Sequence, residues 1–277
     1  KIKSRFINNN NIINATISNN EKFSKKISIN DNLSKEIINY FEDLFSIIYF
    51  LPEMERLFVG SPSLRRNFID RLIFNSNKNY SKIINDYKKN IYERFKILKN
   101  YNNENEWLDN IENKIVDLGV IIYKERLNYI DNINKALQQL DTSNDLDYNI
   151  QINIEDTLLS ECNYKTTKFH DFFIEIIRKN RETDKLFGGS KVGPHKSDIT
   201  GFNFKTNISI NQFSTGQQKT VVLLIILAQC KLLIKNQNIS PIILFDEVCS
   251  HLDHKNRQLL LQIVNTLNVQ TFLTGTE

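Results

Sequence analysis

The sequence predicts an α/β fold, in which a sheet flanked by helices is built from both ends of the chain and a mainly helical lobe is inserted between them. Polar and apolar residues alternate over residues 1–30, which is typical of antiparallel strands. Between residues 61 and 140 apolar residues instead recur every three or four positions, as in packed helices. After residue 185 strand-like and helical segments alternate, the order that gives parallel strands joined by helices.

The N-terminal block, residues 1–60, is expected to form the first part of the sheet-containing head. After the alternating strands, residues 33–45 have a helical pattern. Residues 46–51 (SIIYFL) then predict a short buried strand, and Pro52 ends it because proline cannot continue a central strand.

The middle block, residues 61–184, is expected to be the inserted lobe. Ser61 and Pro62 are typical of an N-cap followed by proline at the first helical position. Helical periodicity then continues to about residue 140, residues 141–165 are less regular, and residues 167–183 predict another helix.

The C-terminal block, residues 185–277, completes the predicted head. Half of the eight glycines lie between residues 188 and 201, which marks a change of composition. Residues 198–210 predict a hairpin. A helix (215–236), a strand (241–246), a second helix (253–266) and a last strand (269–274) come after it.

Composition sets wide limits on function. The chain has 277 residues, of which 40% are hydrophobic and 25% charged, as in globular proteins. Its net charge of +4 is weak support for a nucleic-acid partner. Cys162, Cys230 and Cys249 are too scattered for a disulfide framework, which favours a reducing compartment. The longest apolar run, residues 221–228, is too short to span a membrane and no signal peptide opens the chain, so we expect a cytoplasmic protein with no membrane partner.

An acid-tipped strand is the first candidate for chemistry. The apolar run 241–245 is followed by Asp246 and Glu247, and ligands bind at the carboxyl ends of such central parallel strands. Asp246 is suited to hold Mg²⁺ that bridges nucleotide phosphates, and Glu247 to orient or deprotonate an attacking water. This is a Walker B arrangement. On this segment alone, a buried strand before a solvated acidic turn explains the pattern equally well.

A capped helix start is the second candidate. Ser214 predicts an N-cap before a strongly apolar helix, and the free N–H groups and dipole of a helix N-terminus favour an anion. Gly216 allows close backbone approach, and Lys219 could add positive charge. The candidate nucleotide-binding residues here are Ser214, Thr215, Gly216, Gln217, Gln218 and Lys219. An ordinary capped core helix remains the alternative.

The spacing of the two segments, together with a short motif after the second, favours the functional interpretation. Ser214–Thr220 (STGQQKT) lies about 30 residues before the acidic strand end, and Ser250 and Asp253 form an S-x-L-D segment directly after it. Together these resemble the signature, Walker B and D-loop motifs of ABC-class ATPases. We therefore expect Ser250 and Asp253 near a dimer seam.

At both ends the chain resembles the RecF family. The similar segments are STGQQKT (214–220), PIILFDEVCSHLD (241–253), FLTGTE (272–277), GPHKSD (193–198) and GSPSLRRNFIDR (60–71). The resemblance implies an ABC/SMC-like ATPase head with ATP and Mg²⁺ as cofactors. It also implies an ATP-dependent homodimer in which Asp246 and Glu247 of one subunit and Ser214, Gly216 and Gln217 of the other enclose the nucleotide.

The resemblance further implies binding of single- and double-stranded DNA at gaps and junctions, and RecR-type and RecO-type mediator partners that help to load RecA in recombinational repair and the SOS response. His195 could contact nucleotide or relay across the seam, or could simply cap a hairpin. Candidate DNA-contacting residues are Arg65, Arg66, Arg71, Lys88 and Lys89, for which a solvated basic face is the alternative.

The chain also departs from the family pattern. A GxxxxGK[ST] phosphate loop is absent from these residues, and in the family it precedes the point where this chain begins. Either the fragment or the natural chain lacks it, so we expect weak, DNA-dependent ATPase activity only where that loop is present. Lys196 stands where the family has arginine, which keeps charge but loses bidentate geometry.

Other functions remain open from the sequence. They are a different SMC-like ATPase, an ABC transporter subunit, and a non-hydrolysing DNA-binding scaffold with a relic head. His251 and His254 lie three residues apart after the acidic strand, but a third metal ligand is not evident.

Overall fold

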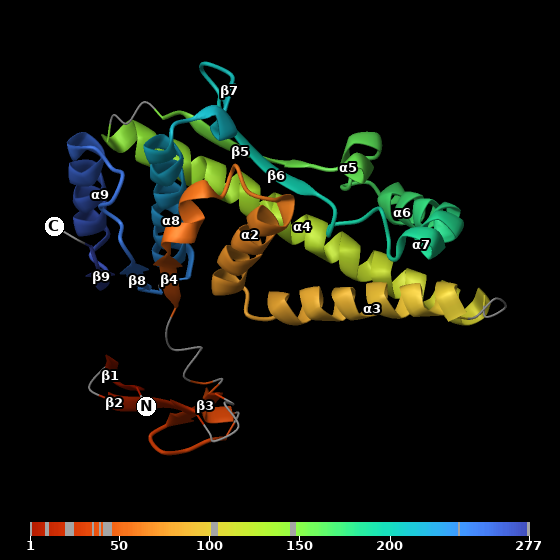
Figure 1. Ribbon diagram of the computed structural model, residues 1–277, viewed down its shortest axis with the longest axis horizontal. Coiled ribbons are helices and arrows are strands. Elements are labelled where there is room, and N and C mark those ends of the chain that lie inside the picture. The colour runs from red at the N-terminus through yellow and green to blue at the C-terminus, as the bar shows by residue number, and fades with distance from the viewer. Residues whose placement is uncertain are drawn as a thin grey trace.

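The computed structural model is elongated, with a sheet-containing head at one end and helices α6 (Lys168–Lys179) and α7 (Arg181–Phe187) at the other (Figure 1). The structure describes residues 2–8, 11–19, 25–34, 36–38, 40, 46–100, 105–144, 148–237 and 239–275. The helix expected over residues 33–45 falls largely outside these residues.

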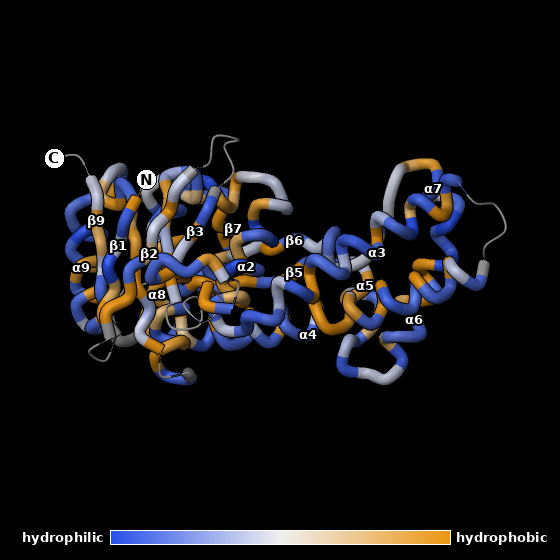
Figure 2. Tube along the Cα trace, turned by 90° about the horizontal axis from the view of Figure 1, so that it is seen from below, coloured by the Kyte–Doolittle hydropathy of each residue, from blue (hydrophilic) through white to orange (hydrophobic). Residues whose placement is uncertain are grey.

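The N-terminal strands form an antiparallel sheet, as predicted. Its order is β1 (Ile2–Asn8), β2 (Asn11–Asn19) and β3 (Lys25–Ile29). This sheet lies across the end of the molecule that carries β9 (Thr271–Leu273), α8 (Thr215–Gln237) and α9 (His254–Leu267), away from α6 and α7 (Figure 2).

A parallel sheet joins the two ends of the chain. Strand β8 (Ile242–Phe245) lies between β4 (Ile47–Phe50) and β9 (Thr271–Leu273), and both pairings are parallel. The predicted central position of the acid-tipped strand is therefore confirmed. One face of β8 is less buried than its apolar sequence suggests, because Leu244 is 38% exposed. This residue lines a cavity of about 480 Å³ together with Phe6 and Ile7 of β1.

Helix α8 (Thr215–Gln237) is the core helix of the head. It packs against β4, α9 (His254–Leu267), the 3₁₀ helix η1 (Pro52–Arg56) and the long helix α4 (Asn105–Asn144). By length and composition α8 could cross a membrane, but 78% of its apolar window is buried inside the protein. A core helix explains that composition fully.

A third sheet connects the head to the lobe. The predicted hairpin is β6 (Asp198–Asn203) and β7 (Ile208–Ser209), followed by the 3₁₀ helix η2 (Ile210–Gln212). Strand β5 (Ile150–Glu155), which the sequence did not predict, pairs antiparallel with β6. The side chain of Asn134 binds both the N–H and the carbonyl of Ile152, so β5 is fixed on α4.

Helices make up most of the lobe. They are α2 (Pro62–Ser76), α3 (Tyr80–Asn100), α4 (Asn105–Asn144), α5 (Thr157–Glu161), α6 (Lys168–Lys179) and α7 (Arg181–Phe187). Pro62 takes the first helical position as predicted, although the Ser61 side chain makes no cap hydrogen bond. The helix expected over 167–183 is two helices, divided at Asn180.

Buried ion pairs hold the far end of the lobe together. The guanidinium of Arg94, 1% exposed, binds Glu112 of α4 (2.9 Å), Asp184 of α7 (2.7 Å) and the carbonyl of Ile177 (2.9 Å). An unpaired buried charge would be costly, so these contacts fix α7 to α3 and α4. The predicted boundary between the inserted lobe and the C-terminal part of the head, at residues 184–185, lies inside helix α7.

Candidate functional site

Asp246 and Glu247 lie at the carboxyl end of β8, and both are exposed. The Asp246 N–H donates to the carbonyl of Phe50 (3.1 Å), which extends the pairing with β4. Thr274, just after β9, donates its hydroxyl to Asp246 Oδ1 and accepts the Glu247 N–H (3.1 Å). Because Glu247 has a left-handed backbone (φ 48°), the chain turns sharply there and both carboxylates remain open to solvent.

These acids fit a magnesium ion better than a transition metal. Mg²⁺ is usually held by one or two carboxylates together with phosphate oxygens and waters, and Asp246 supplies such a carboxylate. Over the described ranges, no group of three or more His, Cys, Asp or Glu side chains is placed to hold a metal. His251 instead lies 3.2 Å from Glu55 through Nδ1.

The start of α8 is capped as predicted. The Ser214 hydroxyl accepts the N–H of Gln217 (3.3 Å), and the Gln217 side-chain carbonyl accepts the N–H of Ser214 (3.0 Å), which is a capping box. Ser214, Thr215 and Gln217 are exposed. The positive end of the helix dipole therefore faces solvent.

Gly216 joins this helix start to the loop after the acids. A Cβ atom at Gly216 would lie 2.7 Å from the carbonyl oxygen of His251, closer than any side chain allows without movement. Glycine is thus required here for contact between two backbones of the same chain. The two candidate motifs form one continuous surface region.

Lys219 and Gln218 have internal roles, which corrects the expectation that they bind nucleotide. The Lys219 side chain is 0% exposed. Its ammonium donates to Glu55 (2.6 Å) and to the carbonyls of Glu247 (3.0 Å) and Ser250 (2.7 Å). Gln218 is 5% exposed and donates to the carbonyl of Phe213 (2.8 Å). Neither side chain is available to a phosphate in this arrangement.

Ser250 and Asp253 shape the loop after the acids. The Ser250 hydroxyl donates to the carbonyl of Glu247 (2.7 Å). Asp253 is the N-cap of α9 and accepts the N–H of Asn256 (2.7 Å). Their predicted position beside the acidic strand end is therefore found, while a role at a dimer seam stays a prediction.

Two residues of this region were not among the predicted site residues. Glu55, with a side chain that is 10% exposed, binds both Lys219 and His251. It lies in η1, 164 residues from Lys219, and no motif marks it. Thr274 comes after the strand β9, and only its position opposite Asp246 in the structure identifies it as a residue of this site.

His195 lies elsewhere, between the lobe helices. The hydroxyl of Tyr87 donates to its Nδ1 (2.8 Å), and its Nε2–H donates to the carbonyl of Ser190 (2.8 Å). Burial lowers the pKa of His195 to about 4, despite the Ser190 hydrogen bond. The structure brings His195 to neither Ser214 nor Asp246, and its contacts support the structural alternative of a turn-forming histidine.

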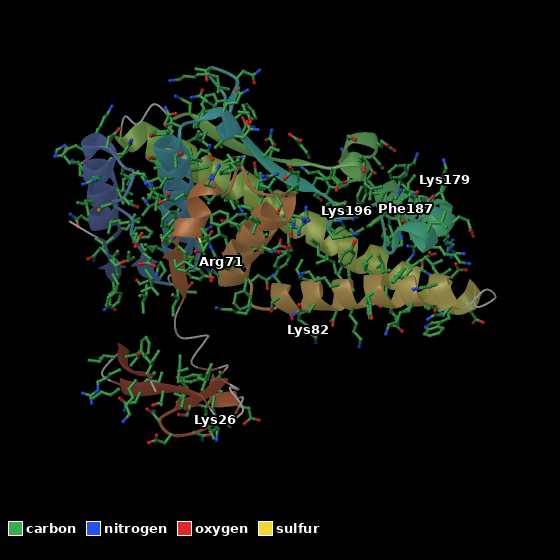
Figure 3. The ribbon with its side chains drawn as sticks, viewed as in Figure 1. Lys26, Arg71, Lys82, Lys179, Phe187 and Lys196 are labelled. Carbon is green, nitrogen blue, oxygen red and sulfur yellow. The ribbon has the colours of Figure 1, made fainter. Side chains whose placement is uncertain are left out.

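The structure separates the five candidate DNA-contacting residues. Arg65 is an internal residue, contrary to expectation: its guanidinium pairs with both oxygens of Asp198 (2.8 Å each) and donates to the carbonyl of Phe58 (3.1 Å). Arg71 is half-buried and stacks over the Tyr49 ring at 4.0 Å, beside β4 (Figure 3). The Arg65 guanidinium is thus occupied inside the fold, whereas a DNA contact by Arg71 stays a prediction.

The remaining three candidates lie on or near one cavity. Arg66 of α2 and Lys88 of α3 line the same cavity of about 170 Å³, which His195 also lines. Lys89 is exposed beside Lys88.

Comparisons with known proteins agree with this fold. A family model described as an AAA domain, putative AbiEii toxin, Type IV TA system, matches residues 8–274. The chain is 35% identical over 233 residues to the DNA replication and repair protein RecF of Rickettsia prowazekii (strain Madrid E), covering 84% of this chain and 64% of that protein. It is 34% identical over 232 residues to RecF of Rickettsia typhi (strain ATCC VR-144 / Wilmington), covering 83% and 63%. The chain thus spans just under two thirds of the length of these relatives.

A solved structure shows the same fold. It is titled as the recombination mediator protein RecF with ATP in the RecFOR pathway, and it matches with a TM-score of 0.77 at 21% identity over 96% of this chain and 72% of that chain. The α/β head with its inserted helices is therefore that of RecF. The chain belongs to the matched AAA-domain family and is a homologue of RecF.

Proposed function

We propose that this protein acts in DNA replication and repair as a RecF-like ATPase that binds DNA in an ATP-bound dimer. One observation carries the proposal. The acids after β8 and the capped start of α8 are held in one surface region by the contact between Gly216 and His251 and by the buried Lys219.

In the proposed dimer each nucleotide lies between two protomers. Asp246 of one protomer would hold Mg²⁺, which would supply positive charge to the phosphates, and Glu247 would accept a proton from the attacking water. The exposed start of α8 in the second protomer, with Ser214, Thr215 and Gln217, offers N–H and hydroxyl donors to the same triphosphate. Hydrolysis would open the dimer, because the γ-phosphate contacted from both protomers leaves as inorganic phosphate while ADP remains on one of them.

The partners in this proposal are those of the RecF relatives. Single- and double-stranded DNA at gaps and junctions would be held by the dimer. RecR-type and RecO-type mediators would assist RecA loading. We expect hydrolysis to be slow and stimulated by DNA, in a cytoplasmic protein.

Analytical ultracentrifugation of the full-length protein with and without ATP tests the proposal. We expect a dimer only with ATP, its loss in Ser214→Arg, and its retention with lost hydrolysis in Glu247→Gln. Ser81→Arg, at an exposed serine near the start of α3, is the matched control. A dimer that forms without ATP, or that survives Ser214→Arg, would refute the proposal.

A further inference from the structure

A cavity of about 170 Å³ lies where α2, α3 and α4 meet the turn before β6. It is separate from the acids after β8 and from the start of α8, none of whose residues line it. Its charged and polar lining includes Ser63, Arg66, Asn67, Lys88 and the ion pair of Asp70 with Arg126.

The charges that line this cavity do not cancel. Asp70 and Arg126 neutralise each other through two contacts of 2.8 Å. Over the described residues, neither Arg66 nor Lys88 has a carboxylate within 4.0 Å. The cavity therefore has an excess of two positive charges, which attracts an anion.

Arg66 is the lining residue whose side chain argues most directly for a bound anion. Arg66 is half-buried, and its guanidinium donates to the carbonyl of Ser197 (2.6 Å). The other N–H groups of the planar guanidinium remain as donors for a ligand. Burial and the nearby Arg126 charge lower the pKa of Arg66 more than Asp198 and Asp70 raise it, so its positive charge is only partly compensated by the fold. A bound anion would supply that compensation.

The other lining groups suit a phosphate oxygen. Ser63 and Asn67 are exposed on the first turns of α2 and offer neutral donors. His195 adds no charge, since it is neutral and already bonded to Tyr87 and Ser190. The volume is below the ~300 Å³ of pockets that enclose small molecules, so the cavity has room for one anionic group and none for a whole nucleotide.

We propose that this cavity binds one phosphate group of a nucleic-acid backbone. Lys88 is exposed on α3 as well as lining the cavity, so the positive charge of the cavity is open to solvent, where a nucleic-acid backbone can present a phosphate. The inference deepens the DNA-binding part of the proposed function and rests on it for the source of the phosphate, but not on ATP or the dimer.

Binding of a fluorescent DNA with a single-strand gap, followed by anisotropy across a salt series, tests this site in the full-length protein, in one series with ATP and in a second series without nucleotide. Arg66→Gln and Lys88→Gln should each weaken binding by about tenfold, the loss expected for one charge-assisted hydrogen bond. Each should also lower the slope of log affinity against log salt by about one. Arg66→Lys should retain most of the salt slope, because it keeps the charge.

The matched control is Lys82→Gln, which removes the same charge from an exposed lysine of the same helix outside the cavity (Figure 3). Circular dichroism melting confirms that each variant is folded. Equal losses in Lys82→Gln and in the cavity variants would overturn the proposal, as would wild-type protein that binds no DNA. In a parallel arm, pyrophosphate that raises the melting temperature of wild type but not of Arg66→Gln, without DNA binding, would assign the cavity to a free anion and reject the nucleic-acid source. ATP-dependent dimerisation is scored separately, so failure of the nucleotide proposal remains distinguishable.

Discussion

Gly216 and the carbonyl oxygen of His251 are in direct contact, so that a Cβ atom at residue 216 would lie 2.7 Å from that oxygen. The contact joins the first turn of α8 to the loop that leads from Glu247 to α9. His251 has a left-handed backbone (φ 59°), which points its carbonyl group along a fixed direction. The contact therefore fixes the distance between the two motifs.

Gly216→Ala should destabilise the fold, although glycine to alanine within a helix normally gains up to about 1 kcal/mol. The added methyl group must displace the His251 backbone, and such overpacking costs about 1–3 kcal/mol. Urea unfolding of the variant measures the change in the free energy of unfolding. Gly275→Ala, where an added Cβ meets no atom within 4 Å, should be close to neutral. A stabilised Gly216→Ala would contradict the contact.

Thr274→Val should slow ATP hydrolysis in the full-length protein without unfolding it. The Thr274 hydroxyl orients Asp246 and also accepts the Glu247 N–H, so its loss should misplace both acids, and misplacement of catalytic groups costs about tenfold or more in rate. Phosphate release at saturating ATP measures this. Thr274→Ser should restore the rate because it keeps the hydroxyl. Thr271→Val, in strand β9 just before Thr274, is the control. Unchanged turnover in Thr274→Val would reject the positioning role.

Local patterns predicted the elements that support the candidate site. The apolar run 242–245 gave the central strand, and Ser214 with Gln217 gave the helix cap, because each depends on residues close together in the chain. Strand β5 was missed since its six residues alternate over too short a stretch to stand out from an irregular, acidic segment. Pairing with β6 and the hydrogen bond from the Asn134 side chain hold β5 in its extended form.

The roles of the charged residues could not be predicted in the same way. Arg65 pairs with Asp198, which is 133 residues away in the sequence, and Lys219 pairs with Glu55, which is 164 residues away. A basic side chain that binds a ligand and one that binds a buried acid have the same sequence pattern. Only the packing of η1 against α8, and of α2 against β6, decides between these roles.

Lys219→Met should destabilise the head by roughly 3–5 kcal/mol, the usual cost of removing one member of a buried ion pair. It leaves the Glu55 carboxylate, 10% exposed, without its cation and frees the carbonyls of Glu247 and Ser250. Adding Glu55→Gln should recover part of that loss, since the unpaired charge is then gone. Urea unfolding of both single variants and the double variant gives the coupling energy. Additive effects would show that the pair does not interact.

His195 should make stability depend on pH between about 4 and 6.5. The folded protein keeps this imidazole neutral down to its pKa of about 4, whereas in the unfolded chain a histidine takes up a proton near pH 6.5. The unfolded state thus binds more protons in this window, so stability is full above the window and falls as pH falls through it. For this one group the free energy of unfolding should drop by about 2 kcal/mol between pH 7 and pH 5.

Urea unfolding at the two pH values, compared with His195→Gln, isolates this contribution. Glutamine can still accept from Tyr87 and donate to Ser190, but it takes up no proton, so the drop should be smaller by about the same 2 kcal/mol. His254→Gln removes an exposed imidazole at the start of α9 and should leave the pH dependence of wild type. If His195→Gln showed the full wild-type drop, the buried neutral imidazole would not be its source, and carboxylates elsewhere would have to account for it.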